Sequence, residues 1–294
     1  MASSFNLCSE CTQKMHRVSF CADLSPNELL TSHIAKDLLL GEGSFGRVFR
    51  VFDKTKAKFV AMKVIRLDLE KTEPEQLEKE VLILKNLDHP SIVKYLCSER
   101  QLASVNIYME YMPGGSVSGL LKQYGPFTEN LTAKFTKQIL QGLHYLHTQK
   151  VVHRDLKCAN ILVASNGTVK IADFGASRLV ENFALIPSNS ELCDSVKGSV
   201  YWMAPEVLKG ESYGRKVDIW SLGCVVLEMV TAKHPWLGLS TYRELCLAIV
   251  EQKLPKIPSG LSGKCRNFLE SCFVYDRKYR PGAQTLLKHP FIST

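Results

Sequence analysis

The segment VVHRDLKCANIL, residues 151–162, decides the fold assignment, because it holds more polar groups than a strand or a buried helix would. Between two apolar dipeptides it carries two cations, one carboxylate, one carboxamide and one thiol, supplied by Arg154, Lys157, Asp155, Asn160 and Cys158. Either the segment is a solvated turn with no further role, or it is a loop whose polar groups are directed at chemistry.

The composition is that of an ordinary globular protein with a slightly basic charge. The chain has 294 residues, of which 45% are hydrophobic and 22% are charged, enough for one large domain or two lobes. The formal charge of +8 is spread along the chain and indicates an anionic partner only weakly. Because no run of basic residues occurs, we expect no nucleic acid to be bound.

The cysteines and the apolar segments argue against two further classes of protein. The 10 cysteines are scattered, and several lie in apolar segments. This pattern is typical of reduced thiols in a cytoplasmic protein rather than of a disulfide framework. The longest apolar stretch, residues 219–230, is too short to cross a bilayer and contains Glu228. We therefore expect neither a secreted disulfide-rich protein nor a membrane protein.

The first part of the chain has strand-like patterns. Residues 1–32 are polar, rich in serine and without a sustained period, and are predicted to form a disordered leader. Apolar runs on both sides of a glycine-rich turn predict strands between residues 33 and 65. Further strands are predicted at residues 91–96 (SIVKYL) and 104–112 (SVNIYMEYM).

Helical patterns interrupt and then follow these strands. Thr72 and Glu75 have capping-box spacing at the start of an apolar helical repeat. After the Pro-Gly-Gly sequence at 113–115 the pattern becomes helical, and residues 216–291 are mostly helical as well. One helical stripe joins Leu131, Phe135, Ile139, Leu143 and Leu146. The expected fold class is α+β, with a small β-rich lobe that holds one key helix and a larger, mainly helical lobe.

The glycine-rich turn, GEGSFGRV, carries Gly41, Gly43 and Gly46. Such a motif fits a dinucleotide-binding fold, a hairpin that covers phosphates, or a flexible turn. Here a strand follows the glycines where a dinucleotide-binding fold would have a helix, which favours a hairpin. Backbone N–H groups of a glycine hairpin can approach phosphate oxygens where a Cβ atom would clash.

Two further sets of polar and charged residues are candidates for chemical roles beside this hairpin. Lys63 ends the apolar strand VAMK, and a buried lysine needs a counter-charge, which Glu80 on the following helix could supply. The alternative is a surface lysine that snorkels to solvent. Asp155 and Asn160, with Asp173 of ADFG, offer oxygen ligands of the kind that Mg²⁺ prefers. A separate carboxylate can accept the proton of an attacking hydroxyl.

Together with APE at 204–206, Asp218 in DIWSLG and Arg280 in DRKYRP, these motifs resemble the protein kinase signature in type and order. The resemblance covers residues 33–291 and implies a bilobal protein kinase fold. It implies an N-lobe at 33–109, a hinge at 110–115 and a C-lobe at 116–291.

The resemblance also implies a nucleotide site and a catalytic site. For ATP it implies Leu40, Gly41, Glu42, Gly43, Ser44, Phe45, Gly46, Val48, Ala61, Lys63, Met109, Glu110 and Met112. Lys63 pairs with Glu80, while Asn160 and Asp173 hold Mg²⁺. Asp155 accepts the proton of the substrate hydroxyl, and Lys157 steadies the transferred phosphate. Glu206, Arg280 and Asp218 match structural residues of the family, and His153 is expected to be a packing residue.

Further sequence details indicate which hydroxyl accepts the phosphate and which branch of the kinase family the chain resembles. Lys157 in DLKCAN resembles serine/threonine kinases rather than tyrosine kinases. Segments such as YMEYMPGGSV and YWMAPEVL resemble the MAP kinase kinase kinases, which implies a MAP kinase kinase as the protein substrate. An upstream kinase or autophosphorylation would activate such an enzyme through the loop that contains Ser195, because Arg154 can bind a phosphate there.

Three departures from the family pattern are visible. Ser199 and Val200 stand where threonine and proline are common, so Ser199 keeps a hydroxyl that can contact Lys157 and is a second phosphosite candidate. The loss of proline is expected to loosen the acceptor platform. Cys158 stands where glycine is common, and a buried, inert thiol is expected there.

The leader and the complete motif set leave alternatives open. Cys8, Cys11, His16 and Cys21 have the spacing of a zinc knuckle, although an unstructured tail with free thiols fits the leader as well. A catalytically weak kinase-fold scaffold is the second functional hypothesis, and a nucleic-acid-binding module built on the leader is the third. The scaffold is disfavoured because Lys63, Glu80, Asp155, Asn160 and Asp173 are all present.

Overall fold

The computed structural model describes eight ranges of the chain, 34–43, 46–66, 81, 83–101, 103–174, 177–179, 199–239 and 241–293. They form two compact units. The first unit consists of the described residues up to Asn86 together with Lys94–Tyr111. The second consists of Leu87–Val93 and the described residues from Met112 onward.

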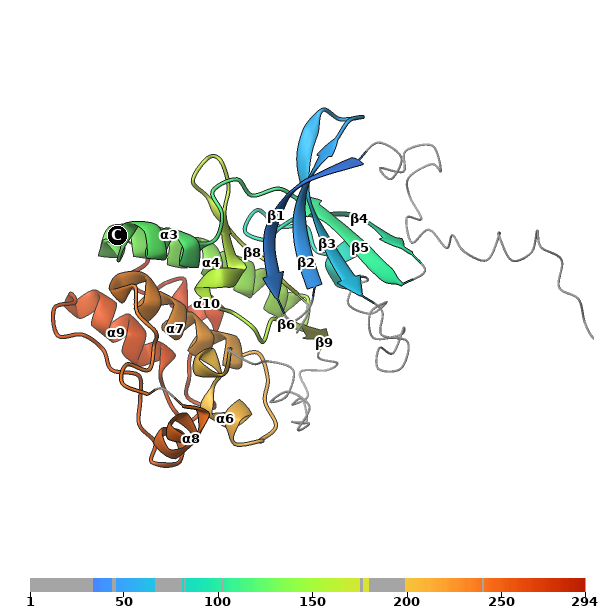
Figure 1. Cartoon of the computed structure of the whole chain (residues 1–294). Coiled ribbons are helices and arrows are strands. Elements are labelled where there is room, and N and C mark those ends of the chain that lie inside the picture. The colour runs from blue at the N-terminus through green and yellow to red at the C-terminus, as the bar shows by residue number, and fades with distance from the viewer. Residues whose placement is uncertain are drawn as a thin grey trace, which may run out of the picture. The chain divides into compact units, whose positions relative to one another are not determined.

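The first unit is built on one antiparallel sheet of five strands in the order β1-β2-β3-β5-β4 (Figure 1). Its strands are β1 (Ile34–Gly43), β2 (Gly46–Asp53), β3 (Lys58–Arg66), β4 (Tyr95–Arg100) and β5 (Ser104–Glu110). The predicted hairpin around the glycines is present, because β1 and β2 pair up to Gly43 opposite Gly46.

Alternation along β3 gives this sheet two different faces. One face holds an apolar cluster in which Val51, Val60, Met62 and Tyr108 are each at most 3% exposed. The other face holds the odd-numbered residues of β3, including Lys63. A one-residue slip of the strand would exchange the two faces, so the buried cluster fixes the register.

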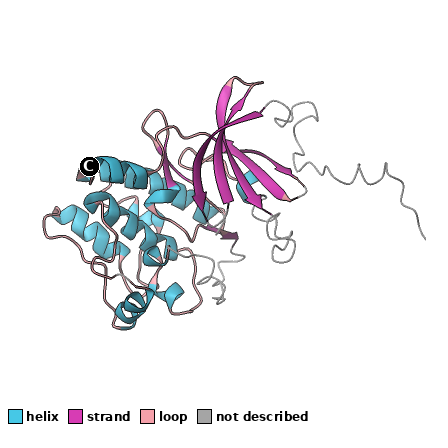
Figure 2. Cartoon of the chain, viewed as in Figure 1, coloured by secondary structure: helices cyan, strands magenta, loops and turns pink. Residues whose placement is uncertain are grey.

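The second unit is mainly helical, as the cyan elements in Figure 2 show. Its α-helices are α3 (Val117–Tyr124), α4 (Glu129–Thr148), α6 (Pro205–Leu208), α7 (Val217–Thr231), α8 (Tyr242–Val250), α9 (Gly263–Cys272) and α10 (Ala283–Leu286). Short strands and 3-10 turns connect them: β6 (Val151–Val152), η3 (Cys158–Asn160), β7 (Ile161–Val163), β8 (Val169–Ile171), β9 (Arg178–Leu179) and η5 (Val200–Trp202).

The core of the second unit lies around α7. This helix is buried along almost its whole length, and α4 and α9 pack against it. The stripe predicted on α4 is present from Phe135 to Leu146, whereas Leu131, one turn after the N-cap Thr128, is 36% exposed. A β-sheet unit and a helical unit confirm the predicted α+β fold class. None of the described helices is long and apolar enough to cross a membrane.

The strand predicted at 91–96 is only partly present. Strand β4 begins at Tyr95, and residues 91–93 belong to the second unit. Ile92 and Val93 are buried there, where Ile171 N donates to Ser91 O and Val93 N donates to Ile171 O. A single bridge to β8 therefore satisfies the apolar pattern that had suggested a continuous strand. The helix predicted from Thr72 lies mostly outside the described residues, and residues 81 and 83–85 are helical.

Candidate active site

The polar segment at 151–162 folds into a loop whose charged side chains meet. The Nζ atom of Lys157 donates to Asp155 Oδ2 at 2.9 Å, and Asn160 Nδ2 donates to the same oxygen at 3.0 Å. Lys157 Nζ also donates to Ser199 Oγ at 2.6 Å. Among the described residues no group donates to Asp155 Oδ1. That oxygen is therefore the one available to accept a proton from an incoming hydroxyl.

Asp218, at the start of α7, holds the backbone of this loop. Its Oδ2 atom accepts from His153 N at 3.0 Å, and its Oδ1 atom accepts from Arg154 N at 2.9 Å. The ring of His147 lies 2.8 Å from Oδ2. Arg154 has φ 72°, a left-handed conformation that a non-glycine residue adopts only when its surroundings impose it. The carboxylate of Asp218 therefore stabilises a strained turn directly before Asp155.

The same contacts change the acidity of Asp218. Complete burial by itself would raise the pKa of its carboxyl group. The hydrogen bond and charge of His147, with smaller contributions from His153 and from the N–H of Arg154, outweigh that effect, so the pKa lies below its ordinary value. The buried carboxylate thus stays ionised and keeps accepting hydrogen bonds from the loop.

His153 joins the loop to the segment that contains Asp173. Because Asp155 N–H donates to His153 Nδ1, the proton of the ring lies on Nε2, which donates to Ala172 O at 3.1 Å. The ring is fully buried against Phe174, as expected of a packing residue. In addition, Ala172 N donates to Asn160 O at 2.8 Å. Asp173, with φ 62°, therefore follows directly after a residue bonded to Asn160.

This donor set fits Mg²⁺. Both hydrogen bonds of the Asn160 side chain use Nδ2, toward Asp155 O and Asp155 Oδ2, so the orientation of the carboxamide is fixed and its oxygen is the ligand atom on offer. Asp173, which follows the residue bonded to the backbone of Asn160, supplies a carboxylate. Hard oxygen ligands from one or two side chains are what Mg²⁺ takes when it also binds phosphates.

One face of α7 also holds the turn that carries Ser199. Ser221 Oγ donates to Trp202 O at 2.8 Å, and Glu228 Oε2 accepts from Trp202 Nε1 at 3.0 Å. Trp202 N in turn donates to Ser199 O at 3.1 Å. The side chain of Glu228 is largely buried, which raises its pKa. These bonds fix the turn in which Ser199 meets Lys157.

Cys158 lies against the same helix, as predicted for a buried thiol. Its Sγ atom donates to Val225 O at 3.6 Å, and its side chain is fully buried. Burial, together with the nearby Glu228 carboxylate, raises the pKa of the thiol well above its ordinary value. The thiolate, which is the reactive form, is therefore suppressed.

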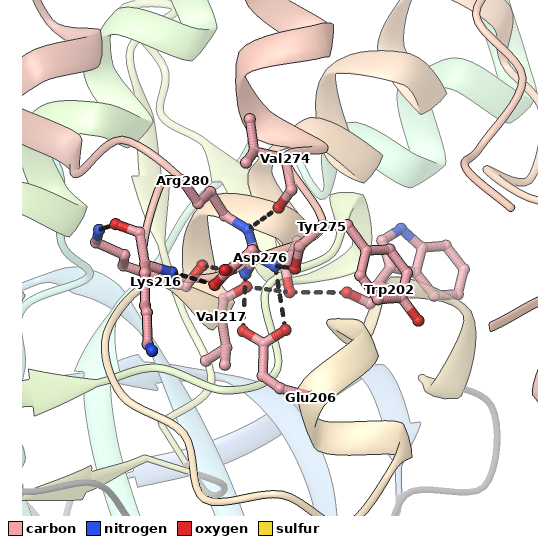
Figure 3. Close-up of polar contacts among 10 residues, drawn as sticks. Trp202, Glu206, Lys216, Val217, Val274, Tyr275, Asp276 and Arg280 are labelled. Carbon is pink, nitrogen blue, oxygen red and sulfur yellow. Dashed lines mark hydrogen bonds and ion pairs between the residues drawn. The ribbon is translucent and has the colours of Figure 1, made fainter. Parts of the chain in front are cut away.

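The second unit also contains a buried ion pair (Figure 3). Arg280 is fully buried and binds Glu206 with both terminal nitrogens, Nη1 to Oε1 at 2.8 Å and Nη2 to Oε2 at 3.1 Å. Its remaining donors reach the carbonyl oxygens of Val274, Lys216 and Tyr275. A buried guanidinium with such complete pairing anchors α6, through Glu206, and the residue before α7, Lys216, to the loop before α10.

In the first unit, the structure brings four predicted nucleotide residues onto one face of the sheet. In β3, Ala61 lies opposite Met109 and Lys63 lies opposite both Val48 and Ile107. Directly opposed residues share a face, so Val48, Ala61, Lys63 and Met109 line the same side. Lys63 is only 9% exposed, which excludes the surface-lysine alternative.

The other described residues that were predicted to bind the nucleotide differ in their exposure and their contacts. Gly46 has φ 125°, and a Cβ atom there would lie 2.1 Å from Val64 O, so only glycine fits. Leu40 is 41% exposed at a bulge of β1, and Gly41 is also exposed. Glu42 forms an exposed pair with Arg47 at 2.9 Å. Glu110 N donates to Lys94 O, and in the second unit Met112 O accepts from Gly115 N.

Several predicted residues lie outside the described part of the chain. They are Ser44, Phe45, Glu80 and Ser195, and also the possible zinc ligands Cys8, Cys11, His16 and Cys21. Conversely, the contacts of His147, Trp202, Ser221 and Glu228 were not predicted from the sequence. His147 continues the i, i+4 series Phe135, Ile139, Leu143, which was a usable signal of burial. No local signal connects Trp202 with Glu228, because only the fold brings them together.

Comparison with known proteins agrees with this geometry. The family model of the protein kinase domain matches residues 34–292, and the chain belongs to this family. Within it, the chain is 44% identical to human mitogen-activated protein kinase kinase kinase 3, over 86% of this chain and 41% of that protein. It is 41% identical to mitogen-activated protein kinase kinase kinase 2 of Arabidopsis thaliana, over 88% of this chain and 40% of that protein. It is 40% identical to mitogen-activated protein kinase kinase kinase A of Dictyostelium discoideum, over 90% and 29% respectively.

These comparisons confirm the resemblance to the MAP kinase kinase kinases that the sequence motifs had indicated. The chain spans about two fifths or less of the length of these relatives.

Proposed function

We propose that the protein is a serine/threonine protein kinase that acts as a MAP kinase kinase kinase. The observation that carries this proposal is the side-chain network of Asp155, Lys157, Asn160 and Ser199. It combines a proton acceptor with a cation beside the place of phosphate transfer, as serine/threonine kinases require. The names of the relatives support the position in the cascade.

In the proposed reaction the oxygen of a serine or threonine side chain attacks the γ-phosphorus of ATP. The bond between that phosphorus and the bridging oxygen breaks, and ADP leaves. The proton of the hydroxyl passes to Asp155, whose Oδ1 accepts no hydrogen bond from the described residues. Lys157 stabilises charge on the transferred phosphate, and its hydrogen bond to Asp155 holds the two side chains in a fixed relative position. Little covalent work falls to the protein, so positioning determines the rate.

The nucleotide is proposed to use the face of the first-unit sheet that carries Val48, Ala61, Lys63 and Met109. The backbone of residues 41–46 would cover its phosphates, and the requirement for glycine at 46 supports this role. Leu40 and the backbone of Glu110 and Met112 complete the proposed set, with Ser44, Phe45 and the Lys63–Glu80 pair as further members. Mg²⁺, held by Asn160 and Asp173, would neutralise phosphate charge when bound.

For the whole protein, we propose a MAP kinase kinase as the substrate and a cytoplasmic location. Five described cysteines, Cys158, Cys224, Cys246, Cys265 and Cys272, are free thiols, which supports a reducing compartment. Activation is proposed to follow phosphorylation of Ser195, by an upstream kinase or by the protein itself. Ser195→Ala should lower activity, and phosphopeptide mapping should find Ser195 occupied in the active protein. Ser199 is a weaker candidate, because it is 5% exposed and bound to Lys157.

The decisive experiment is phosphate transfer from labelled ATP to a catalytically inactive MAP kinase kinase, with a generic basic protein as second acceptor. Asp155→Asn keeps the size of the side chain but removes the proton acceptor, so the rate should fall by about 10²–10⁴-fold. Thermal melting and nucleotide binding of this variant should match the wild type. Equal transfer by both proteins would overturn the enzyme assignment.

A further inference from the structure

The exposed apolar residues of the second unit gather around α8. Of the large hydrophobic residues that are exposed in the described part of the chain, five lie within residues 237–254: Leu237, Tyr242, Leu247, Val250 and Leu254. Single exposed apolar residues are normal on a protein surface. A group of them on and around one helix marks an interaction surface.

Helix α8 has two apolar faces. Leu245, Ala248 and Ile249 are buried against the rest of the second unit. Arg243, Cys246, Leu247 and Val250 follow one another at i, i+3, i+4 and i+7, which places them in one stripe on the other side. Leu247 is 53% exposed and Val250 is 70% exposed. We call these four residues the α8 stripe.

The helix that presents this stripe is firmly held. A capping box joins Thr241 and Glu244 at its first turn. Near its end, Tyr275 Oη donates to Ile249 O at 2.6 Å. In Figure 1 α8 lies at the periphery of the second unit, near α6. A fixed helix at the periphery can bind a partner without the loss of conformational entropy that ordering a flexible segment would require.

The charges at the two ends of the stripe indicate what covers it. Arg243 lies in the first turn, and Glu251 follows directly after the last residue of the helix, so opposite charges stand at opposite ends. A parallel copy of the helix would bring like charges together. An antiparallel copy would bring each Arg243 near Glu251 of the other molecule, which is the self-complementary arrangement that two-fold symmetry requires.

We propose that the α8 stripe is a self-association surface on which two copies of the chain pack α8 against α8 in antiparallel orientation. The two-fold axis passes between residues 246 and 247, the midpoint of the stripe. Cys246 then faces Leu247 of the second copy. The methylene groups of Arg243 cover Val250 of the second copy, while the guanidinium reaches Glu251 beyond it. Glu251 now pairs with Lys253 at 2.5 Å on the exposed surface and can exchange that partner.

The interface is small, so the dimer is weak. A helix of nine residues with two flanking leucines offers less area than the roughly 800 Å² per partner of a standard stable interface. Association should therefore be measured by sedimentation equilibrium of the full 294-residue chain up to about 300 μM. A monomer–dimer equilibrium is expected. A strict monomer over this range would overturn the proposal.

Charge reversal tests the antiparallel arrangement directly. Arg243→Glu and Glu251→Arg should each weaken the dimer about tenfold, because each creates two like-charge contacts across the axis. The double variant restores opposite charges and should recover the wild-type association. Leu247→Glu should abolish association, while Tyr124→Glu, a change at an even more exposed large residue of α3, should have no effect. Failure of the double variant to recover would contradict the antiparallel pairing.

Cross-linking gives an independent readout. A short bis-maleimide should join two chains through Cys246, and Cys246→Ser should prevent this even though other cysteines remain. Cross-linking that survives Cys246→Ser would place the contact elsewhere and overturn the proposal. The same outcome would follow if the chain stayed monomeric while Leu247→Glu impaired binding to a MAP kinase kinase or to anionic phospholipid vesicles, since the stripe would then serve another partner.

Discussion

At the scale of single residues, the site depends on one lysine with two partners. Lys157 Nζ binds both Asp155 Oδ2 and Ser199 Oγ. A flexible lysine side chain has many rotamers, and two fixed acceptors select the one that points toward Asp155. Ser199 thus substitutes for the threonine that is common in the family, as its hydroxyl supplies the same hydrogen-bond acceptor.

Removal of that hydroxyl should therefore slow the reaction. Ser199→Ala leaves Lys157 with one acceptor, and a hydrogen bond to a charged group is worth about 1.5–3 kcal/mol, so kcat/KM should fall about tenfold or more. Steady-state kinetics with a MAP kinase kinase would measure it. Ser199→Thr keeps the hydroxyl and should retain activity within about twofold. Equal kinetics for the alanine variant would mean that Asp155 alone orients Lys157.

At the scale of elements, α7 organises two segments that are distant in the sequence. Asp218 and Val225 hold the loop around Asp155, whereas Ser221 and Glu228 hold the turn of Ser199. Their spacing of three, four and three residues places all four on one face of the helix. The positions of Asp155, the proposed proton acceptor, and of Ser199 are thus both held by a single buried helix.

Glu228 provides a test of this arrangement that does not depend on activity. Burial raises its pKa, so the charged form is disfavoured in the folded state and lowers stability at pH values above the folded pKa. Glu228→Gln removes the charge, while its amide oxygen can still accept from Trp202. The melting temperature near neutral pH should rise by about 2 °C. Glu228→Ala loses the bond and should melt lower than the wild type, and the exposed control Glu270→Gln should not change.

The elements were predictable where local pattern and burial agree. Apolar runs on both sides of the glycine-rich turn predicted the hairpin of β1 and β2, and the stripe on α4 was correct from Phe135 onward. The strand at 91–96 was wrong before Tyr95, because Ile92 is buried against β8 and not within the sheet. Contacts such as Trp202 with Glu228 join residues 26 apart and depend on how helices pack, which periodicity does not report.

At the scale of the whole molecule, Asp218 connects three parts of the second unit. Through His147 it binds the end of α4, through the backbone of His153 and Arg154 it binds the loop around Asp155, and it belongs itself to α7. Loss of its charge should loosen all three together. Acid stability of the chain is therefore expected to depend on this one carboxylate.

The sign of that dependence follows from the lowered pKa. A carboxylate whose pKa is lower in the folded state stabilises the fold above its unfolded pKa of about 3.9, and the stabilisation is lost as the pH falls through the folded value. Asp218→Asn should be less stable than the wild type near neutral pH, and the difference should shrink below about pH 4. Urea unfolding across this range measures it. A constant difference at all pH values would contradict the prediction.

The burial of Cys158 makes this residue a natural reporter of motion. Its thiol can meet a reagent only when the loop around Asp155 separates from α7, because the side chain is fully buried. Under conditions where opening is fast and reversible, the labelling rate gives the free energy of that local opening. A nucleotide that tightens the loop should slow the labelling. The chain thus contains, without any engineering, a chemical probe for the opening of the loop around Asp155.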